Sequence, residues 1–436
     1  MTTLLLLAAF LAPLALVLLS RSDRFGPLAG SAFHPFAVAG FVLFVMALDL
    51  AAAEASIRSG VALSFAGHDR LDPLAMVEGL GRQAVMATAL VLGVALACRG
   101  ATPAPSAVDG DVARRRAVAS RFVFAVALAA ATAASGVILV AGLARGDPFL
   151  IAGARQVYLR DNLLQTVALL TLMPAFILFA GHHAQRMVFL LLTALAAIVV
   201  MLPTGSRVTL LYLALAAATA LAPRLRLPAL AAYAAAPLVV LLLLYLRFLR
   251  SGATTGFATF VEAQGQRLVF AGPDLTFAEA LILLDPAAVP RWPGESLLAM
   301  AVAPLPRALI PWKPEGASTV MTRLADPQRW DATKSEWLTT GFVNLIVEVG
   351  PVLAPILMTA LAYVWARALM RVSAAPWPAI ALRSTILSVT AVQFLRTDLY
   401  NLSLFLWAMA GVALMARLAG ALLRRSAPPA ASGRSE

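Results

Sequence analysis

Four short segments of this chain place arginine or lysine beside residues that stiffen or bend the backbone. They are Pro203–Arg207 (PTGSR), Pro304–Pro314 (PLPRALIPWKP), Lys334–Gly350 (KSEWLTTGFVNLIVEVG) and Phe394–Asn401 (FLRTDLYN). Proline fixes the backbone and glycine frees its amides, so both help to present a cation in one position. A guanidinium binds phosphate oxygens bidentately and stays charged at any accessible pH. These segments therefore predict sites for phosphate groups.

The cations that these segments supply are Arg207, Arg307, Lys313, Lys334 and Arg396. Charged hydrogen bonds contribute about 1.5 to 3 kcal/mol each, so several together can hold a pyrophosphate and stabilise it as a leaving group without a metal. Each segment also has a structural interpretation, as a turn with a snorkelling arginine, a proline-rich crossing of the membrane interface, or an ion pair.

The candidate acids and amides are Glu336, Asp274, Asp398, Asn344 and Glu348. A carboxylate within reach of a hydroxyl acts as a general base. Asn344 and Glu348 lie on neighbouring helical turns inside an apolar run, where polar groups face a cavity or a partner. Asp398 follows Arg396 closely, and their simplest relation is an ion pair.

Other kinds of chemistry find little support. Cys98 is the one cysteine, which excludes an intramolecular disulfide and a thiolate metal site. We interpret the adjacent His182 and His183 as structural, and we expect no metal and no cofactor. The chain lacks the GxxxxGK[ST] phosphate loop, so ATP-driven transport is unsupported.

The rest of the sequence must position these residues within a membrane. Of 436 residues, 61% are hydrophobic and 13% are charged, a composition that a soluble domain does not carry. Apolar runs long enough to cross a bilayer recur along the chain. We predict an all-α polytopic membrane protein with about eleven spans, near residues 2–19, 35–57, 82–98, 121–143, 162–180, 187–202, 207–222, 229–246, 342–365, 377–395 and 402–420.

Arginines distribute asymmetrically between the connections. The arginine-rich short connections all fall on one side if the spans alternate: Arg21 and Arg24, Arg99 and Arg114–Arg116, Arg224 and Arg226, Arg367 and Arg371, and Arg424 and Arg425. The positive-inside rule makes that side cytoplasmic, with the N-terminus outside and the C-terminus inside. The net charge of +12 is thus explained without a nucleic-acid partner.

One long polar region remains, and alternation places it outside. Residues 247–341 contain nine basic and nine acidic residues and four of the seven tryptophans. Two apolar stretches within it, Phe277–Leu284 and Ser296–Ile310, are too short to span and are expected to lie in the membrane interface or to re-enter the membrane beside the bundle. The predicted division is a helical bundle over 1–246, a periplasmic loop over 247–341, further helices over 342–423 and a cytoplasmic tail over 424–436.

The second half of the chain resembles a known family. An outward GSR (Gly205–Arg207), LPRALIPWKP in the long loop, SEWLTTGFVN before a span and a final FLRTD turn together resemble the Wzy-type polymerases of O-antigen and oligosaccharide repeat units. The resemblance implies transfer of a growing glycan from polyprenyl pyrophosphate to a lipid-linked repeat unit, at the outer face of the bacterial inner membrane. It also implies a chain-length regulator and a flippase as partners.

On that resemblance, Arg207, Arg307, Lys313, Lys334 and Arg396 would bind pyrophosphate and Glu336 would be the base, with Asp274, Asp398 and Glu348 as competitors. Three alternatives stay open. An O-antigen ligase uses the same donor but relies on a histidine in the large outer loop, where this chain has none. A flippase would line a central cavity with cations. A polytopic glycosyltransferase would use an acidic pair such as Asp69 and Asp72.

Overall fold

The computed structural model describes residues 2–58, 73–100, 110–144, 163–183, 186–201, 207–235, 237–238, 294–305, 309–325, 327, 330–331, 340–371, 375–397 and 399–425. Among these residues the regular elements are all helices, and the one strand-like feature is an isolated bridge between Ser31 and Pro228. The predicted all-α fold is confirmed for this part of the chain.

The chain forms two compact units that interleave along the sequence. Unit 1 consists of Met1–Ala104, Ala222–Ala374 and Ile386–Leu404, and unit 2 of Pro105–Leu221, Ala375–Thr385 and Phe405–Glu436. Helices α16 (Trp377–Arg396) and α17 (Leu399–Arg425) contribute residues to both units. Each unit is therefore compact in itself.

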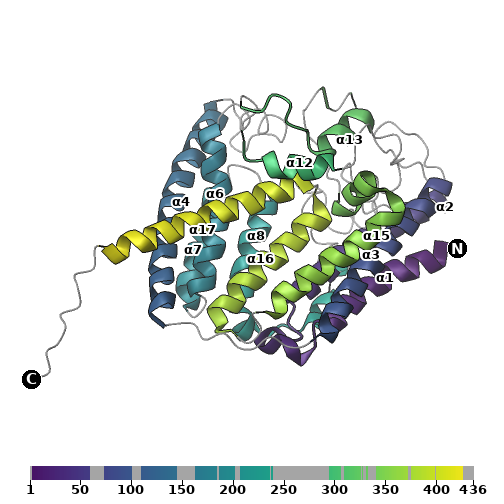
Figure 1. The fold of residues 1–436 in the computed structure, drawn as a ribbon, viewed down its shortest axis with the longest axis horizontal. Helices are drawn as coiled ribbons and strands as arrows, with labels where there is room; N and C mark the ends of the chain where they lie inside the picture. The colour runs from purple at the N-terminus through teal and green to yellow at the C-terminus, as the bar shows by residue number, and fades with distance from the viewer. Residues whose placement is uncertain are drawn as a thin grey trace, which may run out of the picture. The chain divides into compact units, whose positions relative to one another are not determined.

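The described elements of unit 1 are α1 (Thr2–Leu19), the 3₁₀ helix η1 (Asp23–Leu28), α2 (Pro35–Arg58), α3 (Pro73–Arg99), α12 (Glu295–Val302), α13 (Ala317–Ala325) and α15 (Gly341–Met370). Helix α1 packs against α2 and α3, and α3 packs along α15 (Figure 1). Buried side chains from α1, α2, α3 and α15 form one continuous apolar core.

Small residues allow α3 and α15 to approach closely. A Cβ at Gly93 would overlap the backbone of Thr359, and the Thr359 hydroxyl donates to the Ala89 carbonyl at 3.2 Å. Further along, Gly100 lies against the Arg367 side chain. Because these contacts advance in the same direction on both helices, α3 and α15 run parallel. Close packing of this kind is the main source of helix association in lipid.

Helix α15 is broken in its first half. Gly350 has φ 79° and ψ 165°, a left-handed φ that glycine adopts without strain. Pro351 follows and opens the second helical piece, where its missing N–H costs nothing. Asn344 and Glu348 therefore lie on a short first piece, before the break.

The connection between α1 and α2 is held by a cap at the start of α2 and by a hydrogen bond to the segment that follows α8. The Nδ1 of His34 accepts from the Phe36 amide at 3.1 Å and so caps the start of α2, directly before Pro35. Burial lowers the pKa of His34 to about 3. The Ala229 amide donates to the Gly30 carbonyl at 2.7 Å, which joins this connection to the one that follows α8.

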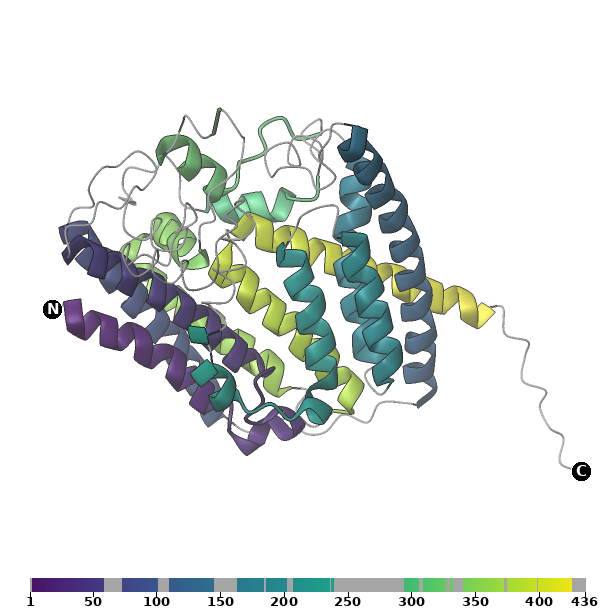
Figure 2. The same ribbon diagram turned by 180° about the vertical axis from the view of Figure 1, so that it is seen from behind.

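Unit 2 is built on α4 (Gly110–Ala144), α6 (Leu163–His183), α7 (Met187–Met201) and α8 (Arg207–Leu225), whose last residues belong to unit 1. Helix α4 packs against both α6 and α7 (Figure 2). The Phe124 ring stacks on Phe179 with centroids 4.6 Å apart, and the Ser135 hydroxyl donates to the Val200 carbonyl at 2.5 Å. These contacts fix α4, α6 and α7 as one bundle.

The described helices have the length and composition of membrane spans in six places. These are Val77–Arg99, Arg116–Ala144, Gln165–His183, Gly341–Met370, Trp377–Arg396 and Leu399–Leu422. Shorter apolar helices occupy Thr3–Leu19, Pro35–Leu48, Met187–Met201 and Leu211–Leu225. The protein is therefore an all-α membrane protein, and the count of eleven spans stays a prediction.

The structure refines the expected elements in the long polar region. The helix expected over Ser296–Ile310 is α12, which ends at Val302, because the backbone turns at Ala303 and Pro304. Helix α13, Ala317–Ala325, was not predicted. The expected helix Phe277–Leu284 lies outside the described residues, as does most of the expected span 229–246, of which residues 229–235 and 237–238 are helical.

Candidate functional site

The structure describes the side chains of four of the residues that the sequence singled out. These are Lys313, Asn344, Glu348 and Arg396, all in unit 1. Arg207 is the first residue of α8, and its side chain is outside the description. The remaining candidates also lie outside the described residues: Glu336, Arg307, Lys334, Asp274 and Asp398.

Glu348 holds the beginning of α12. Its carboxylate oxygens accept from the Gly294 amide at 2.9 Å and from the Ser296 amide at 3.1 Å, and the side chain is buried. These amides belong to the first turn of α12, which has no partner for them within the helix. A carboxylate there also complements the positive end of the helix dipole. Glu348 thus fixes α12 to α15.

Lys313 holds the other end of the same helix. Its Nζ donates to the Ala303 carbonyl at 2.6 Å and to the Leu305 carbonyl at 2.9 Å, and only 7% of the residue is exposed. The ammonium also lies 5.4 Å from the ring centroid of Tyr400, a cation–π distance. Helix α12 therefore has a buried anion at its first turn and a buried cation at its last.

Asn344 joins α15 to the beginning of α17. Its Nδ2 donates to the Thr340 carbonyl at 3.1 Å, and its Oδ1 accepts from the Leu399 amide at 3.4 Å. Thr340 in turn caps α15 by accepting from the Val343 amide at 3.3 Å. Asn344 thus satisfies an amide at the start of α17 and fixes the turn between α16 and α17.

Arg396 ends α16 just before that turn. Its neighbour Thr397 donates its hydroxyl to the Gln393 carbonyl at 2.9 Å, which closes the last turn of α16. The Phe394 ring packs against Gly341, where a Cβ would overlap it. The end of α16 is therefore held against the start of α15, and Arg396 is half-buried there.

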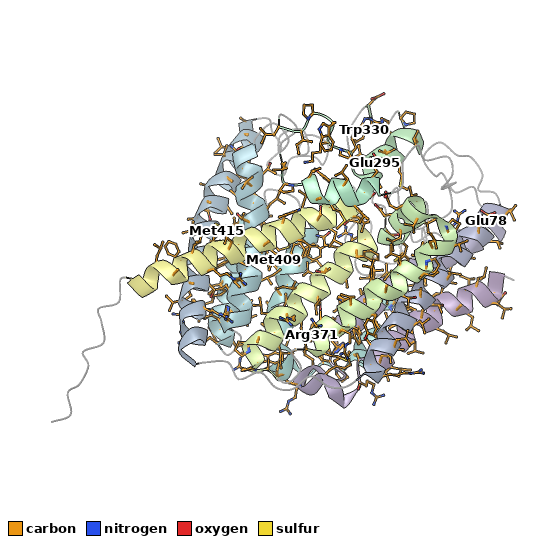
Figure 3. All side chains as sticks on the ribbon, in the orientation of Figure 1. Glu78, Glu295, Trp330, Arg371, Met409 and Met415 are labelled. Carbon is orange, nitrogen blue, oxygen red and sulfur yellow. The ribbon has the colours of Figure 1, made fainter. Side chains whose placement is uncertain are left out.

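One end of unit 1 thus gathers residues from three of the four segments. Lys313 contacts Tyr400 at the start of α17, Asn344 binds the same helix, and Glu348 binds α12 one turn further along α15. Figure 3 labels Glu295, at the start of α12, and Arg371, which lies at the opposite end of α15. The polar cluster formed by Lys313, Asn344 and Glu348 belongs to the end that carries Glu295.

The polar atoms of this cluster bind backbone groups of the helices around it. The carboxylate of Glu348 and the ammonium of Lys313 are both occupied by backbone groups, so neither is available as a base or as a strong anion binder without displacing α12. Sequence reasoning identified the residues but missed Tyr400 and the Gly294 and Ser296 amides. The only available signal was the short helix start at Gly294–Ser296, which is weak.

Within the described ranges no group of three His, Cys, Asp or Glu side chains could hold a metal ion. The expectation of metal-free chemistry therefore stays a prediction.

Compared with protein families, curated proteins and solved structures, the chain shows no significant match.

Proposed function

We propose that this protein polymerises oligosaccharide repeat units carried on polyprenyl pyrophosphate, at the outer face of the bacterial inner membrane. One observation carries the proposal: segments Pro304–Pro314, Lys334–Gly350 and Phe394–Asn401 contribute Lys313, Glu348, Asn344 and Tyr400 to one polar cluster. These are three of the four cation-bearing segments. A site for two lipid-linked substrates needs several such segments at one end of the bundle.

The proposed topology has eleven spans, the 247–341 region outside, the N-terminus outside and the C-terminus in the cytoplasm. Packing within unit 1 supports it in two ways. Helices α3 and α15 run parallel, as alternation requires of the third and ninth spans. The connection containing Arg21 and Arg24 pairs with the one containing Arg224 and Arg226, through Ala229 and Gly30. Both connections are predicted to be cytoplasmic.

The proposed reaction is a glycosyl transfer. A hydroxyl oxygen of the lipid-linked acceptor attacks the anomeric carbon of the growing chain, and a new glycosidic bond forms. The bond between that carbon and the pyrophosphate oxygen breaks, and polyprenyl pyrophosphate leaves with the electron pair. The hydroxyl proton passes to a carboxylate. Cations stabilise the charge that develops on the leaving group, so no cofactor is needed.

Roles are proposed for the residues of this chain as follows. Arg207, Arg307, Lys334 and Arg396 bind the pyrophosphates, and Glu336 is the base, with Asp274 and Asp398 as the competing carboxylates. Lys313, Asn344 and Glu348 position α12 and α17, because their polar atoms are bound to the backbone of those helices. A chain-length regulator and a flippase are the proposed partners.

The test is a gel ladder of envelope glycans from a strain that lacks the gene and is complemented with variants. Wild type is expected to restore the ladder, whereas Arg207→Ala, Arg396→Gln and Glu336→Gln are expected to leave a core with a single repeat. Arg323→Gln is the matched control, because Arg323 lies in the same long region but is half-exposed and paired with Glu315 at 2.8 Å. That variant should restore the full ladder.

Two results would contradict the proposal. Loss of every repeat from the core, with long polymer accumulating on the lipid carrier, would identify a ligase. A normal ladder in the deleted strain would exclude both glycosyl transfers and favour transport.

A further inference from the structure

A group of arginines in unit 2 has no role in the proposed reaction. Arg116 and Arg121 lie on α4, and Arg186 lies just before α7. The Arg121 Nε donates to the Nε2 of His183, the last residue of α6, at 2.5 Å. Arg116 interacts electrostatically with His182, and Arg186 with His183. The three arginines therefore gather at one end of the α4, α6 and α7 bundle.

His183 holds Arg121 in a defined orientation. The Nδ1 of His183 lies 3.0 Å from the Phe179 carbonyl oxygen, which can only accept, so Nδ1 carries the proton and Nε2 is the acceptor for Arg121. His183 is 4% exposed, and its imidazole stacks on the Phe179 ring with centroids 4.5 Å apart. An arginine that merely snorkels to the membrane surface does not need a buried partner that is itself held by a second hydrogen bond.

This arrangement leaves the outer part of the guanidinium available. Only Nε is used by His183, so the two terminal nitrogens keep the planar fork that matches two phosphate oxygens. Arg116, Arg121 and Arg186 are all exposed, and no carboxylate among the described side chains forms an ion pair with them. The group therefore carries a charge of +3 that no described carboxylate neutralises.

Exposed apolar side chains continue from the arginines along the same two helices. On α4 they are Phe122 and Val126, 60% and 53% exposed, and on α7 they are Val188 and Leu192, 66% and 60% exposed. His183, at the end of α6, contacts Arg121 near the start of α4 and Phe189 near the start of α7. Further along, Ser135 of α4 contacts Val200 near the end of α7, so the two helices run parallel. Both apolar rows therefore lead away from the arginines in one direction.

We propose that this end of α4, α6 and α7 binds an anionic membrane phospholipid. Arg121 and Arg186 hold the headgroup phosphate, Arg116 adds a third positive charge, and the acyl chains lie along Phe122 and Val126 on α4 and along Val188 and Leu192 on α7. The charge selects an anionic headgroup, and the apolar rows select a lipid over a free phosphate. His183 is a positioning residue. The inference does not depend on the proposed function.

The test is lipid retention by the purified full-length protein. The protein is exchanged into mixed micelles containing equal amounts of phosphatidylglycerol and phosphatidylcholine, and bound lipid is counted by native mass spectrometry. Wild type should retain phosphatidylglycerol selectively. The double variant Arg121→Gln, Arg186→Gln should lose about tenfold or more of that preference. The double variant Arg21→Gln, Arg323→Gln removes the same charge from exposed arginines of unit 1 and should keep it.

The outcomes separate the alternatives. Equal retention of the two lipids by wild type would overturn the proposal, and this measurement requires no variant to fold. An equal loss in the unit 1 control would also overturn it, because net charge alone would then explain binding. Inorganic phosphate at millimolar concentration should not displace the lipid, and displacement would show that the ligand is a soluble phosphate. His183→Leu should weaken retention while both arginines remain.

Discussion

Glu348→Gln should release the beginning of α12 from α15. The substitution keeps the shape of the side chain but removes its charge and turns one acceptor oxygen into an N–H₂ donor. In the native protein the two oxygens accept from Gly294 at 2.9 Å and Ser296 at 3.1 Å. In the variant one of these amides would face a donor instead of an acceptor.

The expected cost follows from those two contacts. Losing one charged hydrogen bond costs about 1.5 to 3 kcal/mol, and weakening the other to a neutral bond costs roughly 1 kcal/mol. Loss of the favourable interaction with the helix dipole adds about 0.3 to 1 kcal/mol. The sum is about 3 to 5 kcal/mol, and its lower end corresponds to roughly a hundredfold change in the population of open α12.

Hydrogen–deuterium exchange of the peptide that covers residues 294–305 measures that population directly. Exchange of its amides should accelerate at least about a hundredfold in Glu348→Gln. Glu78→Gln is the matched control, because Glu78 is 55% exposed and pairs with Arg82 one turn away at 3.1 Å. Such exposed pairs contribute about 0.3 to 0.5 kcal/mol. Unchanged exchange in Glu348→Gln, or equal acceleration in the control, would refute the assignment of Glu348 as the cap of α12.

Three further predictions concern stability. Lys313→Met leaves the Ala303 and Leu305 carbonyls without their donor and should cost about 2 to 4 kcal/mol, measured as a lower melting temperature. Gly93→Ala should destabilise the protein in thermal unfolding, because the added Cβ would overlap α15. Gly81→Ala on the same helix has open space at its Cβ and should be neutral or stabilise by about 0.5 to 1 kcal/mol. Burial lowers the pKa of His34 from 6.5 to about 3, so the unfolded chain binds a proton at this residue before the folded protein does. The stabilising contribution of neutral His34 is therefore full above pH 6.5, and the free energy of unfolding should fall by about 2 kcal/mol by pH 5, measured in melting curves. His34→Asn keeps an acceptor for the cap and should abolish this loss.

The positions of the helices could be predicted from the sequence because lipid offers the backbone no hydrogen-bond partners. An apolar run in a bilayer must satisfy its own amides and carbonyls, so the run itself is the helix. The run at 2–19 coincides with α1, and the run at 377–395 lies within α16. Helix α12 ends at Val302, two residues before Pro304, which is where a proline commonly follows a helix.

Contacts between segments far apart in the chain could not be predicted from the sequence. Glu348 binds amides more than fifty residues earlier in the chain, and no periodicity connects the two positions. Helix α13 escaped notice because its nine residues, ASTVMTRLA, are shorter than the window over which helical periodicity is recognised, although Val320 and Met321 are buried. The interleaving of the two units is likewise a property of packing, which hydropathy does not encode.

The capping of α12 changes how the remaining charged residues should be weighed. A helix of eight residues does not form on its own propensity, because nucleation is costly and few hydrogen bonds follow it. At this end of the bundle its free amides and carbonyls also need partners, and Glu348 and Lys313 supply them. The sequence predicted Lys313 as a pyrophosphate ligand and Glu348 as a competing base, and the polar atoms of both bind the backbone around α12. The chemistry proposed for the outer face must then come from groups not used in this way, and Arg207, Arg307 and Glu336 become the substitutions with the greatest power to decide the function.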